Sequence, residues 1–118
     1  MTSEELKKRT KKFALEVIKL GDELPRKKAA DVIFGQLVRS GTSVGANYRS
    51  ACRARSRADF ISKITIVEEE ADESGYWIEL LDESGLMRKE RLSDLLKEAN
   101  ELTAIFTASG RTAKTNRK

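Results

Sequence analysis

The clearest hydrophobic pattern in the chain runs through residues 56–85, where apolar or small side chains recur at alternating steps of four and three. This spacing places them on one helix face, in a seam of the coiled-coil type. The seam consists of Phe60, Ile64, Val67, Ala71, Ser74, Ile78 and Leu81. Ser56 is the expected N-cap with Asp59 at the third helical position, and Gly85 is the expected stop. The pattern predicts one long helix.

Two segments before this helix have the same kind of periodicity. The first carries Leu6, Phe13, Val17, Leu20 and Leu24 on one side. Thr2 or Ser3 is its expected N-cap, Gly21 marks its end, and Pro25 is expected early in the next helix. The apolar side of that next helix consists of Ala30, Ile33, Phe34, Leu37, Val38, Val44 and Tyr48. Two glycines within residues 40–45 allow a break there.

The last periodic segment runs from about Arg88 to Ala108, and Gly110 is expected to close it. Its inward positions are Leu92, Leu95, Leu96, Ala99, Leu102, Ile105 and Phe106. The basic and polar residues 111–118 are expected to be a frayed, disordered tail.

Four amphipathic helices joined by short turns bury their apolar stripes most simply as an antiparallel bundle. No segment of the sequence has a convincing strand pattern. The predicted fold is therefore all-α, an up-down-up-down antiparallel four-helix bundle. We expect one bundle domain over residues 1–110, followed by the tail over 111–118.

The composition then limits the chemistry. One cysteine and no histidine exclude an intrachain disulfide and a cysteine-built zinc site, and remove the commonest metal ligand and general base. The acidic run at residues 68–73 lacks the histidines of a carboxylate-bridged dimetal site. We expect no enzyme activity, catalytic residue, metal or cofactor. No stretch approaches the roughly 18 apolar residues of a membrane span, and no secretory signal is evident, so we expect a cytoplasmic protein without membrane contact.

Charge is distributed unevenly along the chain. Residues 1–58 carry 14 basic and 6 acidic side chains, residues 59–110 carry 5 basic and 13 acidic ones, and residues 111–118 add four basic ones. This asymmetry permits contacts between basic and acidic segments or subunits, or a basic face for a polyanion. The modest net charge of +4 favours the first option slightly.

Small residues surround Gly41 and Gly45, which lie four apart and therefore on one helix face. Such a face lets another backbone approach closely, and predicts a tight helix crossing either within the bundle or between subunits. The alternative is an ordinary kink between helices. Asn47 lies among the small residues, where its polar side chain suits a hydrogen bond inside an interface. We assign Gly41, Gly45, Asn47 and the neighbouring Tyr48 to a candidate oligomer interface.

A basic cluster follows, formed by Arg39, Arg49, Arg53, Arg55 and Arg57. Arginine forks bind phosphates in a bidentate manner, so an RNA or DNA backbone is one expected partner. They also fit the carboxylates of residues 68–73, and a solvated or salt-bridged face is the usual role of such runs. We assign the five arginines as candidate nucleic-acid contacts.

Two neighbouring aromatic residues, Tyr76 and Trp77, flank the seam of the third helix. Aromatic side chains just off a core stripe often anchor a second contact surface, although a wet edge of the core is an equally good interpretation. We add both residues to the candidate oligomer interface. With so few aromatic residues, no stacking platform for unpaired bases is evident.

Three blocks of the sequence together resemble a known family. They are residues 40–49 (SGTSVGANYR), 56–61 (SRADFI) and 70–77 (EADESGYW). The chain is similar to the four helix bundle protein family, which is related to proteins encoded in intervening sequences of bacterial 23S ribosomal RNA genes. Here Glu68 and Glu69 precede the third block, where the family pattern has an apolar residue and a lysine, so the third helix is more acidic than the pattern.

The resemblance implies a left-handed bundle that assembles as a ring-like homopentamer. Relatives include the accessory protein of diversity-generating retroelements, a basic pentamer that contacts a reverse transcriptase and nucleic acid. Most members have no assigned molecular activity. The leading hypothesis is therefore a non-enzymatic, oligomeric bundle that acts as an accessory factor associated with RNA or DNA. The alternative is an adaptor that binds a protein partner beside Tyr76 and Trp77 without binding nucleic acid.

Overall fold

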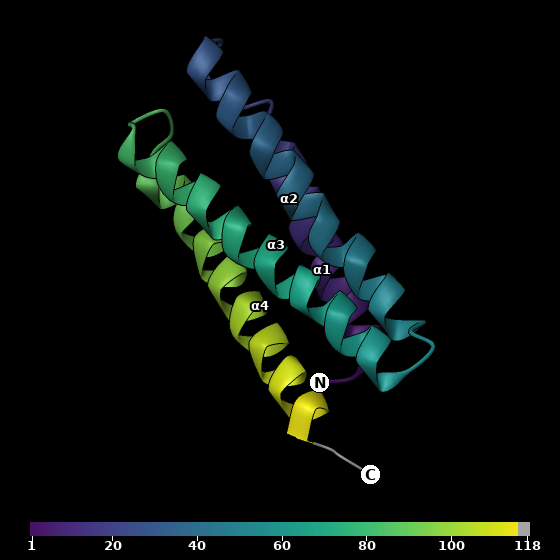
Figure 1. The fold of residues 1–118 in the computed structure, drawn as a ribbon. Coiled ribbons are helices and arrows are strands. Elements are labelled where there is room, and N and C mark those ends of the chain that lie inside the picture. The colour runs from purple at the N-terminus through teal and green to yellow at the C-terminus, as the bar shows by residue number, and fades with distance from the viewer. Residues whose placement is uncertain (116–118) are drawn as a thin grey trace.

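The computed structural model describes residues 1–115 and contains four helices that run alternately up and down (Figure 1). They are α1 (Ser3–Leu20), α2 (Lys28–Cys52), α3 (Arg57–Glu83) and α4 (Lys89–Thr115). Short turns join successive helices, and the bundle measures 53 × 21 × 18 Å along its principal axes. No strand occurs within the described range. The predicted all-α, antiparallel four-helix fold is confirmed.

The predicted N-caps begin α1 and α3, and the predicted glycine follows the end of α3. The Thr2 hydroxyl accepts a hydrogen bond from the Glu5 N–H at 3.1 Å, and the Glu5 carboxylate accepts one from the Thr2 N–H at 3.0 Å, which completes a capping box on α1. The Ser56 hydroxyl accepts from the Asp59 N–H at 3.0 Å at the start of α3. Gly85 follows α3 with φ 75°, a left-handed conformation that glycine adopts without strain.

Two predictions about α2 are wrong. Pro25 lies in the turn before the helix rather than in its first positions, because α2 begins only at Lys28. The helix also continues without a break through residues 40–45. Tertiary packing offsets the helix penalty of two glycines here, since their bare faces let α1 approach.

The predicted end of the last helix is wrong as well. Helix α4 passes through Gly110 and ends at Thr115, so residues 111–115 are helical rather than a disordered tail. Gly110 is buried, and a Cβ added there would lie 3.6 Å from Cγ2 of Ile64. The glycine thus serves a close contact between α4 and α3 instead of a helix stop. The prediction for residues 116–118 lies outside the described residues.

The core runs along the bundle axis and takes side chains from all four helices. Every predicted seam position of α3 is buried except Phe60, which is half-buried near the start of the helix. The largest fully buried side chains are Phe13, Phe106, Leu20, Leu37, Ile64, Ile78, Leu81, Leu92 and Leu102. Residues far apart in the sequence therefore share one core, as expected for a single domain.

The four helices do not pack equally tightly. Helix α3 packs along α2 and α4, whereas α1 packs on α2 and approaches α4 only loosely. A groove of about 700 Å³ separates α1 from α4. Ion pairs cross this groove near each end. Arg9 of α1 donates to Glu98 at 2.6 and 2.7 Å and to Glu101 at 2.8 Å. Arg91 of α4 binds Glu23 at 2.6 Å.

Substitution of Arg9 should weaken the packing of α1 against α4. The Arg9 and Glu98 side chains are 23% and 28% exposed and form a bidentate pair, so we expect Arg9→Ala to lower the free energy of unfolding by about 1–2 kcal/mol. Urea denaturation measures the loss. The matched control is Arg88→Ala, because Arg88 is 86% exposed and lies 3.8 Å from its carboxylate partner. Equal losses in the two variants would contradict a specific role for the Arg9 pair.

Candidate interaction surfaces

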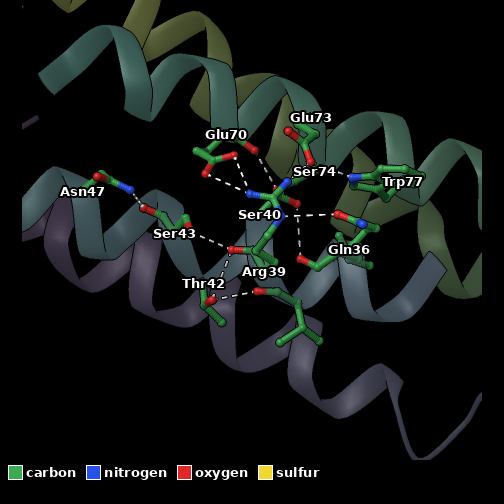
Figure 2. Close-up of polar contacts among 12 residues, drawn as sticks. Gln36, Arg39, Ser40, Thr42, Ser43, Asn47, Glu70, Glu73, Ser74 and Trp77 are labelled. Carbon is green, nitrogen blue, oxygen red and sulfur yellow. Dashed lines mark hydrogen bonds and ion pairs between the residues drawn. The ribbon is translucent and has the colours of Figure 1, made fainter. Parts of the chain in front are cut away.

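A polar network joins α2 to α3 on the outside of the bundle, with Arg39 at its centre (Figure 2). The Arg39 guanidinium donates to the Glu70 carboxylate at 3.2 Å and also binds Glu73. Its Nε donates to the side-chain oxygen of Gln36 at 3.3 Å. The hydrogen bond with Glu73 raises the pKa of Arg39 above its usual range. Arg39, a predicted nucleic-acid contact, thus has its charge compensated within the chain, and a phosphate would have to displace two carboxylates.

Trp77 extends this network along α3. Its indole Nε1 donates to Oε2 of Glu73 at 2.9 Å (Figure 2), and its ring meets the Tyr76 ring edge-on, with centroids 5.0 Å apart. Trp77 is half-buried, whereas Tyr76 is 53% exposed. Of the two aromatic residues assigned to an interface, Tyr76 therefore offers the larger free surface.

The pH should control the contact between Glu73 and Trp77. The indole hydrogen bond, followed by Arg39, lowers the pKa of Glu73 below its ordinary value of 4.5. The carboxylate therefore stabilises the fold fully above that value, and this stabilisation is lost as the pH falls through the lower pKa of the folded state. Because the chain has one tryptophan, we expect its fluorescence to titrate with a midpoint below 4.5. Glu73→Gln should remove this transition, and a midpoint above the ordinary value would contradict the assignment.

Two serines under the network allow α2 and α3 to approach closely. The Ser40 and Ser74 hydroxyl oxygens lie 3.1 Å apart, and both side chains are fully buried. The Ser74 hydroxyl also donates a hydrogen bond to the Glu70 carbonyl oxygen at 2.8 Å. The sequence pattern placed Ser74 in the seam but gave no signal for its partner, because Ser40 was grouped with the small residues around Gly41.

The glycine pair faces α1 of the same chain. A Cβ on Gly41 would lie 3.1 Å from Cγ2 of Val17, and one on Gly45 would lie 3.1 Å from Oγ1 of Thr10. The sequence predicted a tight helix crossing either within the bundle or between subunits, and the structure shows it within the bundle. The assignment of Gly41 to an oligomer interface is wrong because its surroundings are filled by α1, and Gly45 makes the same intrachain approach.

The other two residues of this region also have partners within the chain. Tyr48 is buried in the core, where its ring packs on Phe106 of α4 with centroids 5.2 Å apart, and burial raises the pKa of its hydroxyl. Its assignment to an oligomer interface is wrong for this reason. The Asn47 amide donates to the Ser43 carbonyl oxygen of its own helix at 2.8 Å, so its hydrogen bond does not require a subunit interface.

The remaining arginines of the predicted cluster lie at one end of the bundle. Arg49, Arg53, Arg55 and Arg57 are exposed where α2 ends and α3 begins. Arg39 lies ten residues before Arg49 in the same helix, about 15 Å away along its axis. The predicted cluster therefore divides into a group of four at the end of the bundle and one arginine on its side.

Helix α4 brings more positive charge to the same end. Its C-terminal end lies at the same end of the bundle as the α2–α3 turn (Figure 1). Arg111 and Lys114 belong to this last part of α4. We call the six residues the basic end, defined as Arg49, Arg53, Arg55, Arg57, Arg111 and Lys114. Within residues 1–115, neither Arg49 nor Arg53 takes part in a side-chain ion pair. From the sequence alone, Arg111 and Lys114 were expected in a disordered tail. The up-down order of the helices was the signal that could have placed them at this end of the bundle.

The acidic residues near the basic end are already engaged. The Asp59 carboxylate accepts from the Arg55 backbone N–H at 3.1 Å and from Lys63 at 3.1 Å, and these contacts lower the pKa of Asp59. Glu4 pairs with Lys7 at 3.2 Å. The basic end therefore keeps a surplus of positive charge.

Neither a metal-binding cluster nor a membrane-spanning helix occurs in the described residues. Over residues 1–115, no group of three or more acidic or cysteine side chains is arranged to hold a metal ion. In this same range, none of the helices is long and apolar enough to cross a membrane. Cys52 is exposed and unpaired by any disulfide. The prediction that the chain is not an enzyme stays a prediction.

Similarity to known proteins identifies the family of this four-helix bundle. The sequence model of the family described as 23S rRNA-intervening sequence protein matches residues 3–108. The chain belongs to this family. The family match therefore spans all of α1, α2 and α3 and most of α4. It confirms the resemblance carried by the three sequence blocks.

A solved structure supports membership in the 23S rRNA-intervening sequence protein family. The crystal structure of a protein of unknown function from Bacteroides thetaiotaomicron VPI-5482, described as a member of the S23 ribosomal protein family, has a TM-score of 0.85 and 33% sequence identity. The alignment covers 94% of this chain and 99% of that chain. No curated protein matches the chain.

Proposed function

We propose that this member of the 23S rRNA-intervening sequence protein family is a non-enzymatic, self-associating helical bundle that binds RNA or DNA as an accessory factor. The observation that carries the proposal is the basic end, where α2, the α2–α3 turn, α3 and α4 together place six exposed basic residues at one end of the bundle. Self-association as a homopentamer follows from the family resemblance.

The basic end suits a nucleic-acid backbone better than its bases. Arginine forks bind phosphate oxygens through paired N–H donors. Stacking on bases would need exposed aromatic rings beside the arginines. Tyr48 is buried, and the exposed Tyr76 lies about 28 Å along α3 from Arg57. We therefore expect binding with little sequence preference, driven by the release of counterions from the phosphates.

A salt titration tests the nucleic-acid part of the proposal. With about four phosphates contacted, the affinity for a ribosomal RNA hairpin should fall about a hundredfold between about 50 and about 200 mM salt. Filter binding or fluorescence anisotropy measures it, and a DNA duplex of equal length tests the preference for RNA. Absence of binding to both nucleic acids at low salt would contradict this part of the proposal.

Light scattering behind a sizing column tests the self-association part separately. A homopentamer is expected, and a monomer of 13.3 kDa at every concentration measured would contradict it. This result would leave the basic end and its binding to nucleic acid as an independent question.

The second candidate function is an adaptor that binds a partner protein without nucleic acid. The observation in its favour is the exposed Tyr76 ring beside Trp77, because aromatic anchors dominate many protein interfaces. The two functions differ in their response to salt. A complex held by apolar contacts should change little over the range in which a phosphate complex dissociates.

A further inference from the structure

Helix α1 carries an exposed stripe that combines positive charge with aliphatic surface. Lys8, Lys11, Leu15 and Ile18 follow one another at steps of three and four, so they lie on one face of the helix. Leu15 and Ile18 are 53% and 51% exposed. Within the described part of the chain, neither lysine takes part in an ion pair. We call these four residues the basic face of α1.

Helix α3 carries a stripe of the opposite charge on its solvent side. Glu69, Asp72, Tyr76, Glu79 and Glu83 follow one another at steps of three, four, three and four, which again defines one helix face. All five side chains are exposed, with Tyr76 in the middle. None of the four carboxylates has an ion-pair partner within residues 1–115. We call these residues the acidic face of α3.

Each face alone is unfavourable. Like charges three or four residues apart on a helix repel each other, and Glu79 with Glu83 and Glu69 with Asp72 are such pairs. The Tyr76 ring and the aliphatic side chains of Leu15 and Ile18 add exposed apolar surface. They are three of the six large exposed hydrophobic side chains in the described range. A partner surface of opposite charge with its own apolar centre would relieve both costs.

The two faces cannot meet within one chain. Helices α1 and α3 occupy opposite corners of the bundle, since each packs on α2 and α4 and not on the other, and both faces are exposed. Their lengths are similar, about 15 Å for the basic face and about 21 Å for the acidic face at the helical rise per residue. They also share a step pattern of three, four and three, so the spacing of Lys8, Lys11 and Leu15 matches that of Glu69, Asp72 and Tyr76.

We propose that the basic face of α1 in one copy docks on the acidic face of α3 in the next copy. This inference rests on the self-association in the proposed function and names the surfaces that carry it. Because two different faces meet, the contact is head-to-tail, and repeated contacts close into a ring or continue as an open filament. The basic end shares no residue with either face.

Charge reversal on either face should weaken assembly. The first variant carries Lys8→Glu with Lys11→Glu, and the second carries Asp72→Lys with Glu79→Lys; all four positions are exposed, so the fold should survive, which circular dichroism checks. Sedimentation velocity of each variant should give an association midpoint at a protein concentration about tenfold or more above that of the wild type.

The decisive variant combines all four substitutions in one chain. It reverses the charge at Lys8 and Lys11 of the basic face and at the two carboxylates beside Tyr76 on the acidic face, while keeping the wild-type net charge of +4. Because glutamates of one copy can then face lysines of the next, we expect its assembly to return toward the wild-type midpoint. Wild-type assembly of both single-face variants would overturn the inference and leave the self-association of the proposed function intact. Weakened single-face variants without recovery in the combined chain would overturn it too, because the faces would then contact other surfaces. A monomeric wild type would overturn both the inference and the self-association.

Discussion

Replacement of Phe106 with alanine is expected to lower the free energy of unfolding by about 3–5 kcal/mol, the range found when a buried phenylalanine is truncated. The Phe106 ring is fully buried in α4 and packs on Tyr48 of α2. Its removal leaves a cavity between α4 and α2, which lie across the bundle from each other. A loss of this size is a large part of the total stability of a single domain.

Urea denaturation followed by Trp77 fluorescence measures this effect at a fixed protein concentration, since self-association makes apparent stability depend on concentration. Phe60→Ala is the matched control, because Phe60 is only half-buried at the start of α3. A smaller loss is expected for the control. A loss below about 1 kcal/mol for Phe106→Ala would contradict its place in the core.

The second large effect concerns nucleic acid. Arg53→Glu together with Arg111→Glu should weaken RNA binding about ten- to a hundredfold at low salt, because two phosphate contacts are removed and two negative charges are added. The two positions are 58 residues apart in sequence, and they share one end of the bundle only because the up-down fold returns the end of α4 to the level of the α2–α3 turn. The slope of affinity against salt should become shallower as well.

The control for this variant is Arg26→Glu together with Arg88→Glu. Both arginines are exposed near the opposite end of the bundle, and the pair changes the net charge by the same amount. We expect it to bind RNA almost as the wild type does. Equal weakening in both double variants would show that net charge, rather than the basic end, governs binding.

The seam of α3 illustrates how far sequence reasoning reaches. Steps of four and three predicted Ile64, Val67, Ala71, Ser74 and Ile78 as inward positions, and each of them is buried. Hydrophobic periodicity succeeds here because burial of one helix face is the main contribution to bundle stability. The caps at Thr2 and Ser56 were predictable because their side chains act on backbone groups three residues away.

The glycines illustrate where that reasoning stops. The sequence predicted Gly41 and Gly45 as a tight helix crossing, without deciding between the bundle and a subunit interface, and Gly110 as a helix stop. Each of the three lies in a continuous helix at a close approach of another helix of the same chain. Local propensity disfavours glycine in a helix by about 1 kcal/mol. The packing that offsets this penalty involves partners such as Val17 and Ile64, which are distant in the sequence.

The sequence by itself determined the four helices, their inward faces and the family, because periodicity, capping and family motifs are encoded by neighbouring residues. Only the tertiary structure decided which charges meet. It pairs Arg39 with Glu70 and Glu73 across α2 and α3, and it places the C-terminal end of α4 at the same end of the bundle as the arginines that follow α2. Electrostatic contacts depend on distance in space, and the distances between helices are set by packing of the whole chain.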